Sequence, residues 1–365
     1  MKRILILNLV PNTIGDSILL LSFFNILRKN YGTAFIAVTA DGMSKELWKD
    51  NNEINEIIEV GELTKIGDPE INKFSKAITY LKMFSKIIVR IKKRNFDTCF
   101  IIYPNFFFMH LIPVLAGIRR RIGYTYSGSL FSFLLTKKTP SKLSYDGYYD
   151  RHIIESYLDL LRVAEIPFAK KDTVCIKKVS KKDINKVRKQ LSLLGISPKI
   201  ETAICVHSQS KAVWRNWPPD HFKQLIIKLR KEFDALIFLL GSKEEYEYNK
   251  QLACIDKKVI NLCGKLSLSE VGAILKLSDL FIGNDSGLAH FSSSVGTKTL
   301  VIFGASSPLQ AGPRGYGKTI TIFKNTQENT LNYLRNKNFE ADLKIMRDIS
   351  PREVFKKAVE LLKEE

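Results

Sequence analysis

The sequence predicts an α/β protein made of two consecutive doubly wound domains. Short apolar runs alternate with amphipathic stretches along nearly all of its 365 residues. Many of the runs are almost continuously apolar, which is typical of central strands in a parallel sheet covered by helices on both faces. The length suffices for two ordinary cores. We therefore expect two Rossmann-like domains, residues 1–168 and 169–343, followed by a C-terminal helical segment, 344–365.

The expected first domain starts with a strand over 4–10 and a helix that opens at Asp16. Further strands are expected at 35–39, 57–60, 98–103 and 121–124, with helices at 77–93, 106–116 and 151–166. Residues 128–148 are rich in Ser, Thr, Tyr and Lys, and we expect a mobile loop near the site there.

The expected second domain repeats this alternation. Strands are expected at 173–176, 201–207, 235–240, 259–262, up to 282, at 299–303 and at 320–323, with helices at 182–194, 220–231, from 243, at 268–277, from 286 and at 350–362. Ser350 is the expected N-cap of the final helix, with Pro351 in its first turn.

The charge balance favours anionic partners. Lys and Arg number 57 against 37 Asp and Glu, which gives a net charge of +20. Such a balance suits nucleic acid, an anionic lipid surface or a phosphorylated substrate, although scattered lysines supply much of it. Five cysteines without a CxxC or Cys/His cluster indicate free thiols in a reducing cytoplasm and give no sign of a zinc site.

Several common classes do not fit the sequence. The apolar N-terminus has no small-residue cleavage site, so we interpret it as a first strand and not a signal peptide. The longest apolar stretch, 106–118, is too short to span a bilayer. The three arginines after it, 119–121, suit either a membrane-surface contact or the basic end of a core helix. No G-x-G-x-x-G fingerprint indicates a dehydrogenase, and no strand–loop–helix unit carries a P-loop.

The stretch 277–304 carries the strongest functional signal. It reads as strand, tight turn, short helix and strand, with the turn Asn284-Asp285-Ser286-Gly287. Helix-terminal N–H groups lack intrahelical partners, and Gly287 has no side chain to keep a ligand away, so this turn suits a phosphate or diphosphate. Asp285 is placed to bind sugar hydroxyls. The alternative is a simple capped turn, with His290 packed in the helix.

This stretch resembles the signature of family 9 glycosyltransferases, the heptosyltransferase-like enzymes. The resemblance rests on 285–290 (DSGLAH) with Gly296 and Phe303-Gly304, and on further matches in the same order: Ile14-Gly15-Asp16, Trp217-Pro218 and 345–362. Departures are Arg215 where the family has lysine, Ser22 where proline is common, and 292–294 where alanines are usual.

The resemblance implies a GT-B architecture, with two Rossmann-like domains facing a central cleft. The first domain would bind the acceptor and the second the nucleotide sugar, and the segment 344–365 would pack back towards the first domain. Asp16 would be the general base, although a capping aspartate fits the same position. The segment 117–123 looks structural, although Arg120 or Arg121 could face the acceptor.

On the donor side, the resemblance places Arg215 on the donor phosphates, with Lys211 as a possible helper; a basic surface loop is the alternative. Glu245, or else Glu244, would bind the ribose, although an acid in a first helical turn is favourable anyway. The remaining donor-binding residues implied by the resemblance are Asp285, Ser286, Gly287, Leu288 and His290.

The resemblance therefore predicts an inverting glycosyltransferase that uses a nucleotide-diphosphate sugar, with ADP-heptose as leading candidate. The acceptor would be a lipopolysaccharide core or another anionic surface glycan. No Asp-x-Asp motif is present, so we expect neither a metal nor a cofactor. We expect a cytoplasmic enzyme, with peripheral contact at the inner membrane as a possibility, and no nucleic-acid partner.

Two rival functions differ in their expected behaviour. A nucleotide-sugar epimerase of the same architecture would convert its donor without an acceptor. A non-enzymatic protein that binds polyanions or a membrane surface would lose affinity steeply with salt, independently of Asp16 and Asp285.

Overall fold

The computed structural model describes residues 1–9, 13–61, 73–102, 109–125, 131–140, 151–196, 202–210, 212–324 and 339–364. The chain divides into two compact units. Unit 1 comprises Met1–Tyr148 and Ile153–Thr173, and unit 2 comprises Tyr149–His152 and Val174–Glu365. The division thus falls after Thr173, close to the expected boundary at 168, and a short segment before α5 (Ile154–Val163) belongs to unit 2.

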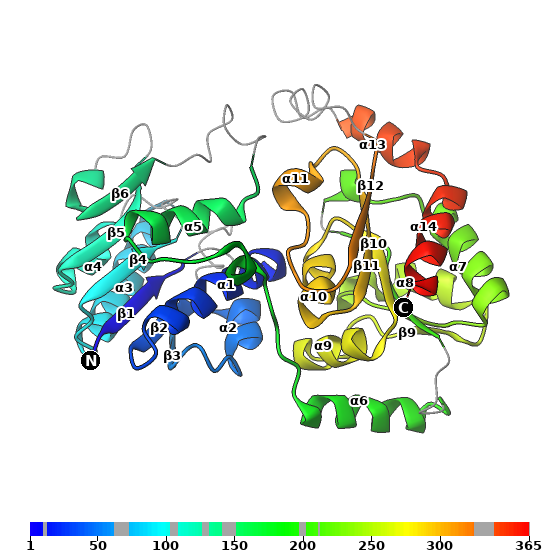
Figure 1. Cartoon of the computed structure of the whole chain (residues 1–365), viewed down its shortest axis with the longest axis horizontal. Helices are drawn as coiled ribbons and strands as arrows, with labels where there is room; N and C mark the ends of the chain where they lie inside the picture. The colour runs from blue at the N-terminus through cyan, green and yellow to red at the C-terminus, as the bar shows by residue number, and fades with distance from the viewer. Residues whose placement is uncertain are drawn as a thin grey trace. The chain divides into compact units, whose positions relative to one another are not determined.

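Unit 1 is a six-stranded parallel sheet in the order β3-β2-β1-β4-β5-β6 (Figure 1). The strands are β1 (Arg3–Leu7), β2 (Phe35–Ala40), β3 (Glu56–Glu59), β4 (Thr98–Ile101), β5 (Arg120–Thr125) and β6 (Lys137–Pro140). The helices are α1 (Ile14–Asn30), α2 (Gly42–Trp48), α3 (Lys73–Lys92), α4 (Leu111–Leu115), η2 (Ser132–Leu134), α5 and η3 (Lys170–Thr173). Because β1 pairs with both β2 and β4, the strand order reverses beside β1, where ligands bind in sheets of this kind.

Unit 2 repeats this topology, with the order β12-β11-β10-β7-β8-β9. The strands are β7 (Ala203–His207), β8 (Leu236–Leu239), β9 (Val259–Asn261), β10 (Leu280–Asn284), β11 (Lys298–Phe303) and β12 (Thr319–Phe323). The helices are α6 (Lys181–Leu193), η4 (Val213–Arg215), α7 (Pro219–Phe233), η5 (Lys243–Glu245), α8 (Tyr246–Ala253), α9 (Leu268–Leu277), α10 (Gly287–Val295), α11 (Pro308–Ala311), α13 (Phe339–Asp348) and α14 (Pro351–Lys363). Here the order reverses between β7 and β10.

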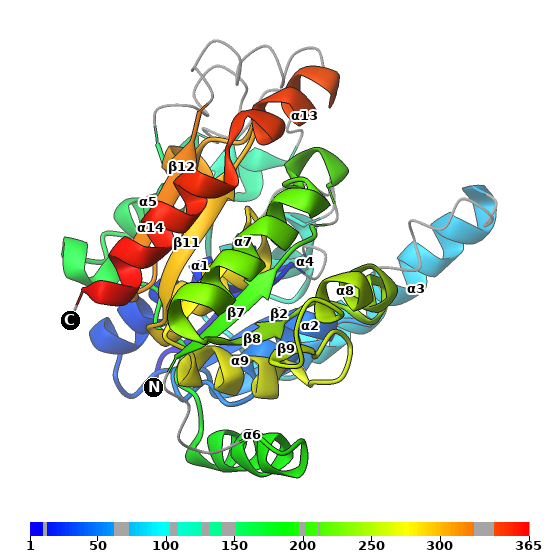
Figure 2. The same cartoon turned by 90° about the vertical axis from the view of Figure 1, so that its right-hand side faces the viewer.

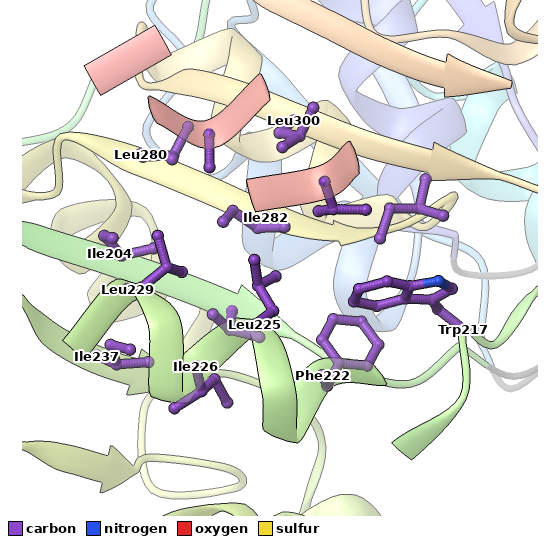
Figure 3. Close-up of a cluster of buried hydrophobic side chains, with 14 of the residues drawn as sticks. Ile204, Trp217, Phe222, Leu225, Ile226, Leu229, Ile237, Leu280, Ile282 and Leu300 are labelled. Carbon is purple, nitrogen blue, oxygen red and sulfur yellow. The ribbon is translucent and has the colours of Figure 1, made fainter. Parts of the chain in front are cut away.

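The core of unit 2 joins α7 to the sheet. Trp217 and Phe222 are completely buried, and their rings meet edge to face with centroids 4.9 Å apart (Figure 3). Apolar side chains from the strands complete the cluster, among them Ile204, Ile282 and Leu300. This packing fixes the Trp217-Pro218 segment, which leads directly into α7.

The C-terminal helix belongs to unit 2. Helix α14 contacts α7, β10 and β11 (Figure 2), and its buried residues Val354, Ala358 and Leu361 extend the same core. The apolar face of α14 is thus covered by α7 and the sheet beside it. The expectation that the segment 344–365 packs back towards the first domain stays a prediction. Ser350 caps this helix as predicted, because its side chain accepts a hydrogen bond from the Glu353 N–H.

A few elements differ from the sequence prediction. Residues 173–176, expected as a strand, follow η3 as irregular chain. Helix α2 and strand β6 were not predicted, because α2 is short and β6 is a polar edge strand without an apolar run. Of the loop expected at 128–148, residues 131–140 contain η2 and β6, and the others lie outside the described residues. Within the described part of the chain, no helix is long and apolar enough to cross a membrane.

Candidate functional site: the carboxyl edges of the two sheets

Asn284 organises the carboxyl edge of β7 and β10 in unit 2. Its side chain is completely buried: Oδ1 accepts a hydrogen bond from the Trp217 N–H at 3.0 Å, and Nδ2 donates to the Ser208 carbonyl at 2.9 Å. One amide thus ties the end of β10 to both ends of the loop between β7 and α7. This bond explains structurally why the Asn-Asp-Ser-Gly turn and the Trp-Pro segment occur together.

Arg215 and Asp285 form an ion pair at this edge. The Arg215 Nη1 lies 3.2 Å from the Asp285 Oδ2, which also accepts a hydrogen bond from the Ser306 hydroxyl at 2.6 Å. The Asp285 side chain is 4% exposed, whereas that of Arg215 is 33% exposed and lies over the Trp214 ring, with its Cζ 4.5 Å from the ring centroid. The buried Asp285 carboxylate therefore orients the Arg215 guanidinium, which is exposed enough to bind an anion.

His207, which the sequence analysis did not identify as a functional residue, links two predicted donor-binding residues. This histidine ends β7 and is buried; its Nδ1 lies 3.0 Å from the Ser286 Oγ, and its Nε2 lies 3.2 Å from the Glu245 Oε2. Its position at the last residue of the first strand in the unit is the signal that could have identified it, because that strand borders the switch point.

Glu245 occupies space that Gly241 leaves open. A Cβ added to Gly241 would lie 2.1 Å from the Glu245 Oε2, so the glycine is required for this carboxylate position. Glu244, the alternative in the sequence analysis, is exposed, whereas Glu245 is half-buried and contacts His207. The geometry therefore favours Glu245.

Helix α10 starts at Gly287, with Ser286 as its N-cap. The Ser286 side chain makes no capping hydrogen bond to the helix, because its hydroxyl bonds to His207 instead. Leu288 and His290 are buried on this helix. Lys211 lies outside the described residues.

The serines at 292–294 have partners on neighbouring elements or on their own helix. The Ser292 Oγ lies 2.9 Å from the Thr299 Oγ1, and the Ser293 Oγ lies 3.1 Å from the Thr319 Oγ1. The Ser294 hydroxyl donates to the Phe291 carbonyl. These departures from the family pattern therefore add hydrogen bonds to β11 and β12 without disturbing the turn before α10.

Asp16 lies in the first turn of α1, after the carboxyl end of β1 in unit 1. Its Oδ2 accepts a hydrogen bond from the Thr13 hydroxyl, and its Oδ1 lies 3.4 Å from the hydroxyl of the buried Tyr157. Asp16 itself remains partly exposed. It is therefore oriented on two sides and still accessible, as a general base must be.

Comparison with known proteins identifies the family of this chain. The model of glycosyltransferase family 9 (heptosyltransferase) matches residues 84–342. The chain belongs to this family. It is 24% identical over 323 residues to lipopolysaccharide heptosyltransferase 2 of Escherichia coli K12, which covers 83% of each chain.

Two solved structures share the fold over almost the whole chain. One is the glycosyl transferase family 9 protein of Veillonella parvula, with a TM-score of 0.82 and 20% identity, covering 100% of this chain and 98% of the other. The other is the E. coli ADP-heptose lps heptosyltransferase II, with a TM-score of 0.75 and 21% identity, covering 99% and 98%. The family 9 chain therefore has the GT-B fold, as predicted, and is a glycosyltransferase of the lipopolysaccharide heptosyltransferase family.

The structure places Arg120 and Arg121 of this glycosyltransferase away from Asp16. Both lie at the start of β5, at the amino edge of the sheet, whereas Asp16 follows the carboxyl end of β1. The Arg120 guanidinium donates to the Ala164 carbonyl, and that of Arg121 to the carbonyls of Leu134 and Ile118. Both guanidinium groups therefore hold the backbone of their own unit, and the acceptor-binding role stays a prediction.

His152 is held neutral by its surroundings in unit 2. Its Nε2 lies 2.7 Å from the Gly312 carbonyl oxygen, to which it donates. Burial, reinforced by the nearby charge of Arg314, lowers the pKa of His152 to about 3.

In the part of the chain that the structure describes, no group of three or more His, Cys, Asp or Glu could hold a metal ion.

Proposed function

We propose that this family 9 enzyme transfers a heptosyl group from ADP-heptose to a lipopolysaccharide core or a similar anionic surface glycan, with inversion at the anomeric carbon. The observation that carries the donor assignment is the Arg215–Asp285 pair beside the N-terminus of α10, at the switch point of unit 2. The names of the relatives support the sugar and the acceptor: one is a lipopolysaccharide heptosyltransferase, and another, of known structure, is an ADP-heptose lps heptosyltransferase.

In this proposal the diphosphate binds the backbone N–H groups of residues 286–288 and the exposed face of Arg215. Both supply positive charge where the leaving group develops negative charge, so they stabilise the transition state more than the ground state. Asp285 binds sugar hydroxyls, and Glu245 binds the ribose. Lys211 and His290 stay proposed members of the donor site.

Asp16 is the proposed general base. An inverting transfer needs a group that takes the proton of the attacking hydroxyl, and a partly exposed carboxylate held by Thr13 and Tyr157 fits this role. We propose residues 1–168 as the acceptor-binding domain. We also propose that transfer needs no metal, because Arg215 and the α10 N-terminus would neutralise the diphosphate. The enzyme would work in the cytoplasm, with its basic surface near the membrane that carries the acceptor.

A donor screen by thermal unfolding tests the proposal. Purified protein is incubated with ADP-heptose and with several ADP-, UDP- and GDP-sugars, with and without EDTA. We expect ADP-heptose to raise the Tm, by an amount that grows with ligand concentration and is unaffected by EDTA. Asp285→Ala and Arg215→Ala should lose this shift.

The matched control is Arg188→Ala, which removes an exposed arginine from α6 and should keep the full shift. Stabilisation by a different sugar nucleotide, lost in the same two variants, would keep the site and change the donor. Stabilisation by polyanions alone would contradict a glycosyltransferase site. Stabilisation that EDTA abolishes would contradict metal independence.

A further inference from the structure

The hydrogen-bond partners of His207 place one hydrogen on its Nε2 and leave its Nδ1 with two states. The Glu245 carboxylate can only accept hydrogen bonds, so the His207 Nε2, at 3.2 Å from it, carries a hydrogen. In the neutral ring the Nδ1 is then an acceptor, and the Ser286 hydroxyl, at 3.0 Å, must donate to it. The single hydroxyl hydrogen of Ser286 is thus directed at the ring and is not available to a ligand.

Protonation of His207 reverses this bond. The protonated ring has hydrogens on both nitrogens, so the Nδ1 donates to the Ser286 Oγ. The Ser286 hydroxyl hydrogen is then free to point at an oxygen of a bound diphosphate. The positive ring also adds a favourable charge beside an anion at the N-terminus of α10.

The groups around His207 are compatible with this change. On the η5 side, His207 faces Glu245. The Cys263 thiol, which follows β9, lies beside Glu245. Burial, together with the Glu245 charge, raises the pKa of Cys263 to about 12, so this thiol is neutral. On the α10 side it faces Ser286, whose neighbour Asp285 is paired with Arg215. An anion at the N-terminus of α10 would therefore lie beside a ring whose Nε2 is already hydrogen-bonded to the Glu245 carboxylate.

We propose that His207 is a positioning residue that takes up a proton from solvent when a nucleotide-diphosphate sugar binds, which turns the Ser286 hydroxyl from the ring towards the diphosphate. This inference rests on the donor site of the proposed function. No bond of the donor is made or broken in this step. Because binding is linked to proton uptake, donor affinity should fall as the pH rises, by at most about tenfold per pH unit for one proton.

Isothermal titration calorimetry with ADP-heptose, in the absence of acceptor, tests this linkage. The diphosphate diester of this ligand has no phosphate group that titrates near neutrality, unlike a phosphate monoester. The binding heat is measured at the same pH in two buffers with different ionisation enthalpies. We expect a difference that corresponds to an uptake of up to one proton for the unaltered protein.

Ser286→Ala and His207→Gln should bind ADP-heptose more weakly, and His207→Gln should show no buffer-dependent heat. Ser286→Thr, which keeps the hydroxyl, should retain the proton uptake. His221→Gln is the matched control, because it removes a histidine of α7 that lies against Trp217, and it should take up protons as the unaltered protein does.

The outcomes separate this inference from the proposed function. Binding of ADP-heptose with equal heat in both buffers would overturn the role of His207 alone. Uptake that persists in His207→Gln would also overturn it, since the proton would then reside elsewhere. No binding in either buffer would overturn the proposed donor, and this inference with it.

Discussion

The two units have the same strand order, yet their carboxyl edges differ in how the polar side chains are arranged. In unit 2, Asn284 accepts from the Trp217 N–H, Asp285 pairs with Arg215, and His207 lies between Ser286 and Glu245. Among the described residues of unit 1, the side-chain atoms Asn8 Oδ1, Asp41 Oδ2 and His110 Nε2, which follow β1, β2 and β4, are buried without a hydrogen-bond partner, as the Arg215 Nε is in unit 2.

Topology therefore sets where a site can form, and the residues decide how far it is preorganised. The proposed donor side in unit 2 has these contacts before any ligand is present, which limits the ordering cost of binding. In unit 1, Asp16 has only Thr13 and Tyr157 as its described hydrogen-bond partners. The buried side-chain atoms of unit 1 named above could therefore form hydrogen bonds with a ligand. Four substitutions test this difference, from the largest expected effect to the smallest.

Asp16→Asn should have the largest effect of the four substitutions, and it should lower the transfer rate without changing donor binding. It removes the proposed base and keeps the side-chain shape, so we expect kcat for heptosyl transfer to fall by about 10²–10⁴. The Tm shift with ADP-heptose should stay unchanged, because the donor network lies in unit 2. A variant that keeps most of its transfer rate would remove Asp16 from the mechanism.

Gly241→Ala should displace the Glu245 carboxylate from its position beside His207. The added methyl would collide with the Glu245 carboxylate, so we expect the Kd for ADP-heptose to rise by about tenfold or more. Calorimetric titration measures this change. Gly32→Ala in unit 1 is the matched control, because no atom lies within 4 Å of the position of its Cβ. Unchanged affinity in Gly241→Ala would show that the Glu245 position does not matter for the donor.

Arg120→Ala distinguishes a structural role from the predicted acceptor-binding role at the amino edge of unit 1. The loss of the bond to the Ala164 carbonyl should lower the free energy of unfolding by about 1–3 kcal/mol, as measured by urea denaturation. The KM for the acceptor should not change. Arg119→Ala, which removes an exposed neighbour, should be close to neutral in both assays. A selective rise in the acceptor KM of Arg120→Ala would restore the acceptor-binding role.

His152→Gln should flatten the pH dependence of stability. The pKa of His152 is about 3 in the folded chain, below its ordinary value of roughly 6.5, so between these values the unfolded chain binds the extra proton. Stability therefore falls as the pH drops below about 6.5, by up to about 1.4 kcal/mol per pH unit from this group. Urea denaturation at pH 5 and 7.5 should show a smaller loss in the variant, and equal losses would contradict this assignment.

The sequence by itself determined the two α/β units, most strands and helices, the turn before α10 and the cap at Ser350. These features depend on residues close together in the chain, since apolar periodicity and capping are local properties. The resemblance of 285–290 to one family also indicated the family, because a turn that exposes helix N–H groups is encoded by a few consecutive residues.

Only the tertiary structure decided which side chains meet. His207 reaches Ser286 across 79 positions and Glu245 across 38, and these contacts depend on β7 lying between β8 and β10. The same holds for Arg120, whose guanidinium donates to a carbonyl of the chain after α5, 44 positions away. Strand order and register bring such residues together, and no local pattern of residue types reports that arrangement.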